Sequence, residues 1–459
     1  MKDTSLSPRD VAVWALGDRA GNVSANLDRL LARGGLSSED RSLAHELALG
    51  AHRRRDTLAA IERAFLTQPD RRLPGALNEI LHVGLYQLLF LTRVPDFAAV
   101  HEAVEQAVRH RHRRQSGLVN GLLRTVARSI SPMQAGPVPL AADVLPVGPA
   151  AWRRFDKPVF PDPAIDPRGY LAAAHSLPAA LAARWLEQAH SLDTAVAWAT
   201  HANCRPPLVL RVNSLRTTAS AVLAALAAEG VAARMHANGS SIVLDRHTDI
   251  RQLAPFREGL VQPQDATASA VVTEALRPRA GMDVLDFCAG PGTKTTYVAE
   301  LMGNAGSITA VDTTAEKLAA IESNCRRLGV TIVRTVLADQ VGGLLPGGFD
   351  VALADVPCSN TGVLARRVEA RWRFDEVALA KLVKDQRFLL AAAGHFVKPG
   401  GRLVYSTCSI EPEECGDLAR AFARRSDRFK LADEHLTLPA GADDPATWRD
   451  GGYYAVFQG

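Results

Sequence analysis

The chain has 459 residues, of which 47% are apolar and 22% charged, and its net charge is +4. This length exceeds one ordinary hydrophobic core, so about two to four domains are expected. No apolar run reaches the roughly 20 residues that span a bilayer, and the N-terminus lacks the apolar core of a secretory signal. The six cysteines are scattered and read as free thiols rather than a disulfide framework. We therefore expect a cytoplasmic protein without a membrane partner.

Positive charge is concentrated in the first third of the chain. Residues 1–130 contain 19 Lys and Arg against 14 Asp and Glu, whereas the remainder contains 34 against 35. The densest basic runs are Arg53–Arg55 and Arg109–Arg114. Such runs suit a polyanion such as RNA, although a solvated helix face would have the same pattern.

The first 130 residues are predicted to be helical. Segments 40–65 and 75–91 carry apolar residues at helical spacing, with Asp40 and Asp96 as candidate helix starts. Residues 131–169 are rich in proline and weakly periodic, which is typical of a semi-rigid linker.

Two further regions follow this proline-rich stretch. Residues 170–260 begin as helix and then combine apolar strands at 206–217 and 241–246 with an Ala-rich helix at 219–229, which predicts a small α+β unit. From 261 to 459, short apolar strands alternate with helices. This pattern favours a mostly parallel sheet with helices on both faces, and no internal repeat is visible.

The most specific motif is the passage 282–300, where a buried strand leads through CAGPGTK into a helix. Gly290 and Gly292 allow a tight turn that approaches a ligand closely, and the helix start offers free N–H groups. The next strand ends in Asp312, which could accept both ribose hydroxyls, and the third ends in Asp339, within reach of an adenine amino group. These strand ends predict a site for a nucleoside cofactor.

Other ligands fit this site less well. A P-loop is excluded because Thr293 stands where a Walker motif has glycine before its lysine, and the GxGxxG spacing of a dinucleotide site is absent. A glycine turn without a ligand would not explain three such strand ends in succession. S-adenosylmethionine fits best.

Two cysteines follow the next two strands. Asp355 and Cys358 end the fourth strand, and Cys408 ends the fifth, so all three should lie at one edge of the sheet. Either cysteine alone would more often be a small buried apolar residue. Together they suit methylation at cytosine C5, which needs a thiolate to add to C6 and an acid such as Asp355 near N3. Lys294 could lower the pKa of the thiol or orient the base.

The strings CAGPGTK, ADVPCSNTG and YSTCS resemble those of the NOL/NOP2/Sun RNA cytosine-5 methyltransferases. RVPDFAAVHEAVEQA and GLVNGLLR, within residues 1–130, are similar to the NusB RNA-binding helical domain. This pairing is similar to the bacterial branch of the family that acts on small-subunit 16S rRNA. The resemblance covers nearly the whole chain except residues 131–169.

The resemblance implies a multidomain fold with an all-α NusB-like domain (1–130), a linker (131–169), a small RRM- or ferredoxin-like RNA-binding unit (170–260) and a Rossmann-like class I methyltransferase domain (261–459). It implies Cys408 as the nucleophile and Cys358 as the group that helps release the product, with Asp355 and Lys294 beside them. It also implies a cofactor site formed by Cys288, Ala289, Gly290, Pro291, Gly292, Thr293, Lys294, Asp312, Asp339 and Asp355. Thr293, Asn360 and the stretch 368–373 depart from the usual pattern, which weakens any assignment of the target nucleotide.

Other functions remain open at this stage. An amino-directed methyltransferase would carry Asn/Asp-Pro-Pro-Tyr where this chain has Asp355-Val356-Pro357-Cys358, and a DNA cytosine-5 enzyme would lack the Cys408 motif. A non-enzymatic NusB-like RNA-binding factor would have no need of the aspartates and cysteines. Zinc is not expected, because no CxxC pair exists. We expect a monomer that acts on a loop or single-stranded cytosine of rRNA.

Overall fold

The computed structural model describes residues 7–17, 22–69, 72–246 and 248–459, and the chain forms two compact units. Unit 1 comprises Met1–Cys204 and Arg367–Phe374. Unit 2 comprises Arg205–Arg366 and Asp375–Gly459. The chain therefore leaves unit 2 after Arg366 and returns to it at Asp375.

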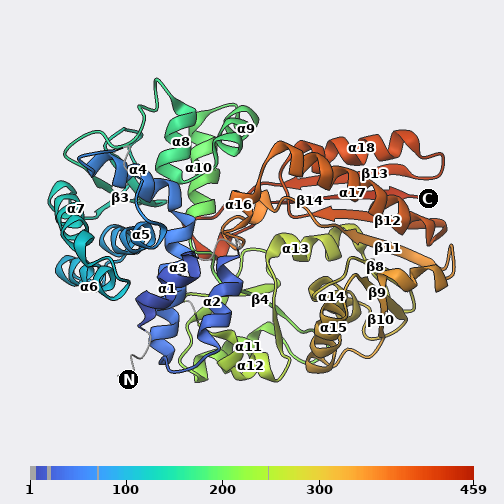
Figure 1. The fold of residues 1–459 in the computed structure, drawn as a ribbon. Helices are drawn as coiled ribbons and strands as arrows, with labels where there is room; N and C mark the ends of the chain where they lie inside the picture. Colours follow the sequence, from blue (N-terminus) through green and yellow to red (C-terminus); the bar gives the residue numbers. More distant parts are fainter. Residues whose placement is uncertain (1–6, 18–21, 70–71, 247) are drawn as a thin grey trace. The chain divides into compact units, whose positions relative to one another are not determined.

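Unit 1 begins with a bundle of helices (Figure 1). They are α1 (Pro8–Gly17), α2 (Val23–Leu31), α3 (Ser38–Arg53), α4 (Arg55–Phe65), α5 (Gly75–Phe90), α6 (Asp96–Arg109) and α7 (Ser116–Ser129). The start predicted at Asp40 is two residues late, because the Ser37 side chain caps α3 by accepting from the Asp40 N–H at 3.1 Å. Asp96 is the first residue of α6, as predicted.

Residues 131–169 are not a linker, which corrects the prediction from their proline content. They form a three-stranded antiparallel sheet, β1 (Gln134–Ala135), β2 (Val144–Gly148) and β3 (Ala151–Arg154), in the order β1-β3-β2. Pro146 is tolerated because β2 is an edge strand. Leu145 is buried in the core of the helical bundle, and Arg54 donates to the Pro146 and Val147 carbonyls at 3.1 Å. These contacts make the segment part of unit 1.

Unit 1 is completed by helices from two distant parts of the chain. They are α8 (Pro167–His175), α9 (Ala179–Ala189), α10 (Leu192–Asn203) and α16 (Ala370–Arg373). Arg371 in α16 is fully buried and donates to the carbonyls of Arg53, Ser176 and Ala202 and to the Asn203 side chain. The region 170–260, predicted as one α+β unit, is therefore divided between the two units.

Unit 2 contains a small four-stranded antiparallel sheet in the order β5-β6-β4-β7. Its strands are β4 (Val209–Val212), β5 (Ala233–Met235), β6 (Ser241–Leu244) and β7 (Val261–Pro263), accompanied by α11 (Ala219–Ala228) and α12 (Ala254–Arg257). Leu210, Ile242 and Val261 from three strands share one apolar core with Val222 and Leu226 of α11. We call this part the small sheet module.

The larger sheet of unit 2 has seven strands in the order β10-β9-β8-β11-β12-β14-β13. They are β8 (Asp283–Phe287), β9 (Ser307–Asp312), β10 (Val333–Leu337), β11 (Phe349–Asp355), β12 (Val397–Thr407), β13 (Lys430–Thr437) and β14 (Gly452–Gln458). The first five pair in parallel, whereas β14 is antiparallel to β12 and β13. The strand order reverses between β8 and β11, which is where open α/β sheets bind ligands.

Helices cover both faces of this sheet, as the alternating side chains of β12 show. Val404 shares a core with Tyr297 of α14 (Thr293–Leu301) and Ile321 of α15 (Ala315–Leu328). Its neighbour Tyr405 points the other way and donates to Gln386 of α17 (Glu376–His395) at 3.2 Å. α18 (Gly416–Arg425) contacts β13 and β14. The predicted Rossmann-like class is confirmed.

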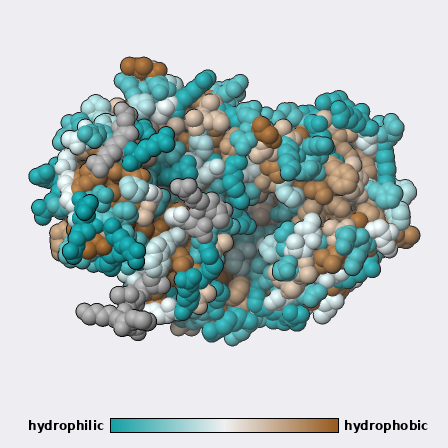
Figure 2. Space-filling view, in the orientation of Figure 1, coloured by the Kyte–Doolittle hydropathy of each residue, from teal (hydrophilic) through white to brown (hydrophobic). Residues whose placement is uncertain are grey.

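No helix among the described residues is both long and apolar enough to cross a membrane. Figure 2 shows hydrophilic and apolar residues intermixed on the visible face.

Candidate active site

The loop between β8 and α14 forms one side of the candidate site. Cys288 and Gly292 adopt left-handed backbone conformations, with φ of 76° and 91°. A Cβ at Gly290 would lie 2.7 Å from Asp312 Oδ2, so only glycine lets the loop approach β9 so closely. Ala289 is buried, and Pro291 is exposed after a cis peptide bond.

Asp312 closes this loop from the end of β9. Its Oδ2 accepts from the Gly290 N–H at 2.8 Å, and its Oδ1 accepts from Lys317 Nζ at 2.8 Å and the Thr313 N–H at 2.6 Å. Burial alone would raise the pKa of Asp312, but these hydrogen bonds hold it below its ordinary value. The group is therefore a carboxylate at neutral pH, as a hydroxyl acceptor must be.

Asp339 lies on the same side of the sheet but apart from these contacts. It follows β10, two residues after Leu337, and Leu337 is the Cα partner of Asp312. Its side chain is exposed. The strand register thus places Asp339 at the same edge of the sheet as Asp312, as predicted, but Asp339 does not share the hydrogen bonds between Asp312 and the loop after β8.

Asp286 is a buried acid beneath the loop that the sequence reasoning missed. It is 1% exposed, and its Oδ2 accepts from Thr295 Oγ1 at 2.6 Å, while Oδ1 is buried without a hydrogen-bond partner. Burial raises the pKa of Asp286 to about 7. Its only sequence signal is an acid in the middle of an apolar strand.

Lys294 and Asp355 form an ion pair beside the loop, with Nζ and Oδ2 2.7 Å apart. Asp355 also accepts from Ser406 Oγ at 2.5 Å, and Ser406 is its Cα partner on β12. Burial alone would lower the pKa of Lys294, but the Asp355 carboxylate raises it above its ordinary value. Lys294 is therefore a permanent cation at this edge.

The two predicted cysteines meet at the same edge. The Sγ atoms of Cys358 and Cys408 lie 3.0 Å apart, and both thiols are free. Asn360 Oδ1 lies 3.3 Å from Cys408 Sγ and is an alternative acceptor for the single Cys408 S–H. By contrast, burial raises the pKa of the Cys288 thiol to about 12, so Cys288 is not a thiolate.

The two cysteines share a hydrogen bond, which shifts their pKa values in opposite directions. Donation to Cys358 raises the pKa of Cys408 well above its ordinary value, and burial adds to this. Acceptance of that hydrogen bond lowers the pKa of Cys358. The charge of Lys294 acts in the opposite direction on Cys408. In the free protein the first thiol to ionise is thus Cys358.

A buried carboxylate that the sequence reasoning missed holds the Cys358 loop. Glu414 is fully buried and accepts from the Ser359 N–H at 2.9 Å, from Ser359 Oγ, and from Gln386 Nε2 at 2.7 Å. Gln386 Nε2 also donates to the Pro357 carbonyl at 2.9 Å. The loop after β11 is therefore fastened to α17 and to the turn after β12.

A pocket in unit 2 brings Lys294, Asp355 and Cys408 together. Asp265 and Asp450, which Arg366 bridges, also line it. Other lining residues include Thr267, Val271, Thr407, Thr437 and Tyr454. The pocket thus presents a thiol, a cation and a carboxylate to one small space.

Within the described ranges, no group of three or more His, Cys, Asp or Glu side chains is arranged to hold a metal ion.

Comparison with known proteins gives three family matches. The model described as 16S rRNA methyltransferase RsmB/F matches residues 273–447. The NusB family model matches residues 9–128, and the ferredoxin-like domain of RsmF/B-like methyltransferases matches residues 177–251.

Relatives extend this similarity over nearly the whole chain. The chain is 31% identical to the probable ribosomal RNA small subunit methyltransferase B of Bacillus subtilis (strain 168), covering 94% of this chain and 90% of the relative. It is 32% identical to the ribosomal RNA small subunit methyltransferase B of Sodalis glossinidius, covering 97% and 95%.

Two solved structures are also similar. The crystal structure of PH0851 covers 99% of both chains with a TM-score of 0.74 at 21% identity. A methyltransferase homolog protein from Pyrococcus horikoshii covers 63% of this chain and 97% of its own, with a TM-score of 0.52 and 26% identity.

Proposed function

The chain belongs to the family of ribosomal RNA small subunit methyltransferase B (RsmB), and on that premise we propose that it forms 5-methylcytidine in 16S rRNA from S-adenosylmethionine, with Cys408 as a covalent nucleophile. Family membership confirms the resemblance found in the sequence motifs. The observation that carries the chemical proposal is the cysteine pair, with its sulfur atoms 3.0 Å apart, next to the Lys294–Asp355 ion pair.

The loop after β8 fits the cofactor. Any side chain at Gly290 would fill the space between the loop and Asp312, and Gly292 opens α14 with its first N–H groups at the sheet edge. We assign Cys288–Lys294 and Asp312 to hold S-adenosylmethionine, with Asp339 and Asp355 bordering it. When bound there, S-adenosylmethionine supplies a methyl group on a sulfonium.

The target cytosine would enter the pocket that contains Cys408. Its C5 is a poor nucleophile until Cys408 has lost its proton to solvent and the thiolate has added to C6, which moves electron density to C5 and N3. Asp355, hydrogen-bonded to Lys294 and Ser406, faces the pocket. It would take up a proton from solvent and donate it toward N3 as negative charge develops there, and the proton would return to solvent when the thiolate leaves. The Lys294 ammonium stabilises the Cys408 thiolate both before it attacks and when it leaves.

Cys358 would act in the release of the product. Once C5 carries the methyl group, its proton must leave, so that the C5=C6 double bond forms again and the Cys408–C6 bond breaks. The lowered pKa of Cys358 favours a thiolate that can accept this proton. The proton then passes to solvent, and Cys408 is again free.

The helical part of unit 1 would bind the rRNA, and the ferredoxin-like region would assist it. We expect a monomer that works in the cytoplasm and meets its cytosine in a loop or single-stranded segment, because the base must leave its stack to reach Cys408.

The direct test is to incubate the protein with labelled S-adenosylmethionine and unmodified small-subunit rRNA, digest the RNA and identify the labelled nucleoside. Label in 5-methylcytidine supports the proposal. Label in another nucleoside would reject the cytosine chemistry while leaving the family membership in place.

A further inference from the structure

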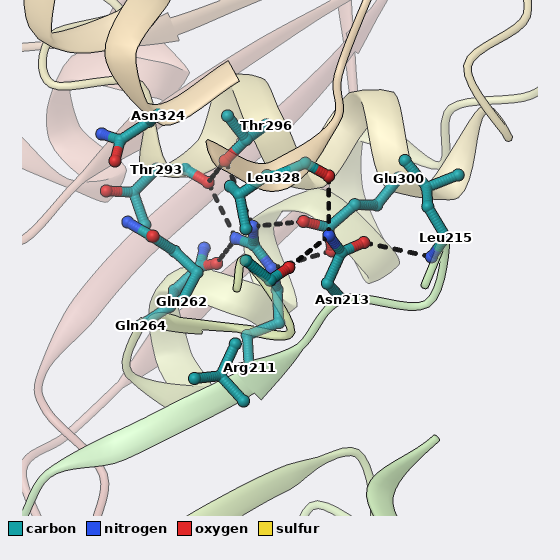
Figure 3. Close-up of polar contacts among 12 residues, drawn as sticks. Arg211, Asn213, Leu215, Gln262, Gln264, Thr293, Thr296, Glu300, Asn324 and Leu328 are labelled. Atoms are coloured by element: carbon teal, nitrogen blue, oxygen red, sulfur yellow. Dashed lines mark hydrogen bonds and ion pairs between the residues drawn. The ribbon is translucent and has the colours of Figure 1, made fainter. Parts of the chain in front are cut away.

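Arg211 connects the small sheet module to the helix that begins at the cofactor loop. It lies on β4 and is 2% exposed. Figure 3 shows its side chain directed toward Thr293, Thr296 and Glu300 of α14, with dashed lines to all three. Arg211 therefore joins the small sheet module to α14, the helix that follows the loop at residues 288–292.

The guanidinium of Arg211 uses all of its nitrogen atoms. Nε and Nη2 donate to the two oxygens of Glu300 at 3.1 and 2.7 Å, and Nη1 donates to the Thr293 carbonyl at 2.8 Å. Nη2 also donates to Thr296 Oγ1 at 3.1 Å, and Nη1 to Gln264 Oε1. The planar group can serve several acceptors at fixed angles, which a lysine ammonium cannot do.

Burying the Arg211–Glu300 ion pair costs desolvation free energy, which an apolar contact at the same place would not. The Glu300 side chain is 0% exposed and that of Arg211 2% exposed. Apolar residues of similar volume would stabilise such an interface at least as well as buried charges. What the charged pair adds is a fixed orientation of the donor to Thr293.

A second, independent connection reaches the other side of Gly292. Arg327 on α15 donates to the carbonyls of Phe256 and Val261 in the small sheet module at 2.9 and 3.1 Å. Arg327 also donates to Asn324 Oδ1 at 3.3 Å, and Asn324 Nδ2 donates to the Pro291 carbonyl at 3.0 Å. The module thus holds the carbonyls of Pro291 and Thr293, one on each side of Gly292.

We infer that Arg211 is a positioning residue for the cofactor loop and that the small sheet module forms part of the cofactor site rather than only an RNA-binding extension. This inference rests on the proposed binding of S-adenosylmethionine at that loop. Arg211 acts by holding the Thr293 carbonyl, which keeps the turn at Gly292 in the conformation that presents its N–H groups.

Asn213 provides a matched control, because it stabilises the same boundary away from the loop (Figure 3). It is fully buried on the same side of the module and donates to the carbonyls of Gly259 and Leu328 at 2.8 and 2.9 Å. Loss of these bonds loosens the module without changing a direct contact to residues 288–294.

The experiment compares Arg211→Lys, Asn324→Ala and Asn213→Ser with the unchanged full-length protein. Hydrogen exchange of the peptide that covers residues 288–294 is measured without ligand, and S-adenosylhomocysteine affinity is measured by calorimetry. We expect Arg211→Lys to raise the Kd about tenfold, the effect of one lost charged hydrogen bond, and to speed exchange in the loop. Asn324→Ala should do both to a smaller extent, and Asn213→Ser should lower the Tm with less than about a twofold change in Kd.

The outcomes separate the two proposals. If the unchanged protein fails to bind S-adenosylhomocysteine, the proposed cofactor is rejected, while exchange of the loop still tests the positioning role. If the unchanged protein binds but Arg211→Lys and Asn213→Ser change Kd and loop exchange equally, Arg211 is only a structural tie and the inference is overturned.

Discussion

At the scale of single residues, the two cysteines differ in proton state although their sulfur atoms lie 3.0 Å apart. The hydrogen bond lowers the pKa of Cys358 and raises that of Cys408. A lowered pKa suits the thiolate that accepts the proton from C5. A raised pKa suits a nucleophile that must stay a thiol until the cytosine has entered the pocket. The local electrostatics therefore favour two separate roles for the pair.

Replacement of each cysteine should separate these roles. Cys408→Ser should lower methylation by about 10³-fold or more, because no covalent adduct can form, while S-adenosylhomocysteine binding persists. Cys358→Ala should accumulate a protein–RNA adduct that resists denaturing electrophoresis. Substantial turnover by Cys408→Ser would reject the assignment of the nucleophile.

The buried Asp286 predicts a pH-dependent stability. Burial raises its pKa in the folded protein to about 7 from an ordinary 3.8, so the folded state binds the proton more tightly than the unfolded state does. The free energy of unfolding should therefore fall as pH rises from about 4 to 7 and then level off. Asp286→Asn should be more stable than the unchanged protein at pH 8 by a few kcal/mol, with the difference shrinking toward pH 5. A difference that is constant over this range in thermal or urea unfolding would mean that Asp286 does not titrate there.

At the scale of elements, the active edge depends on how the ends of β11 and β12 are fastened. Glu414, in the turn after β12, binds the backbone and hydroxyl of Ser359, next to Cys358. Gln386 of α17 joins the same carboxylate to the Pro357 carbonyl. The position of Cys358 therefore depends on three separate elements.

Glu414→Ala should lower kcat by up to about 100-fold, because the Cys358 loop loses its acceptor, while the affinity for S-adenosylhomocysteine stays within about twofold. Asp417→Ala, three residues later and exposed on α18, is the control and should remain near the unchanged rate. The prediction fails if kcat and cofactor affinity fall together, because the whole edge would then have collapsed.

Local motifs could be predicted from the sequence where one short segment carries the signal. Gly290 and Gly292 predict a tight loop by themselves, and the TCS string predicts a strand end with a thiol. Arg211, Glu300 and Glu414 could not be found this way, because each gains its role from a partner distant in the chain. The linker prediction for residues 131–169 is wrong because apolar residues of this stretch, such as Leu145, are buried against a helical bundle formed by earlier residues.

At the scale of the whole molecule, the two basic runs in the first third of the chain differ in how far their arginines are exposed. Arg53 and Arg54 are buried, and Arg54 donates to backbone carbonyls, so two of the three arginines in that run are no part of a surface patch. Arg111, Arg113 and Arg114 are exposed at the end of α6 and the turn that follows. In the second run, Arg109 pairs with Asp10, so Arg111, Arg113 and Arg114 are its arginines best placed to meet phosphates.

Replacement of Arg111, Arg113 and Arg114 by alanine should weaken rRNA binding and reduce the slope of log Kd against log salt by about 2, because three phosphate contacts are lost. Arg424→Ala with Arg425→Ala, exposed on α18, is the comparison and should change the slope less. An unchanged slope in the triple variant, measured by filter binding at several salt concentrations, would make the run a solvated helix face.

The return of the chain to unit 1 at Arg367–Phe374 has a consequence for its synthesis. The carbonyls of Arg53, Ser176 and Ala202 receive their buried donor, Arg371, only after Arg205–Arg366 has been made. The N-terminal helices can collapse early on the ribosome, but their core is completed late, when most of unit 2 has already emerged. Unit 1 thus reaches its final state only after Arg371 has emerged, so a nascent chain that stops before residue 371 would leave both units unfinished.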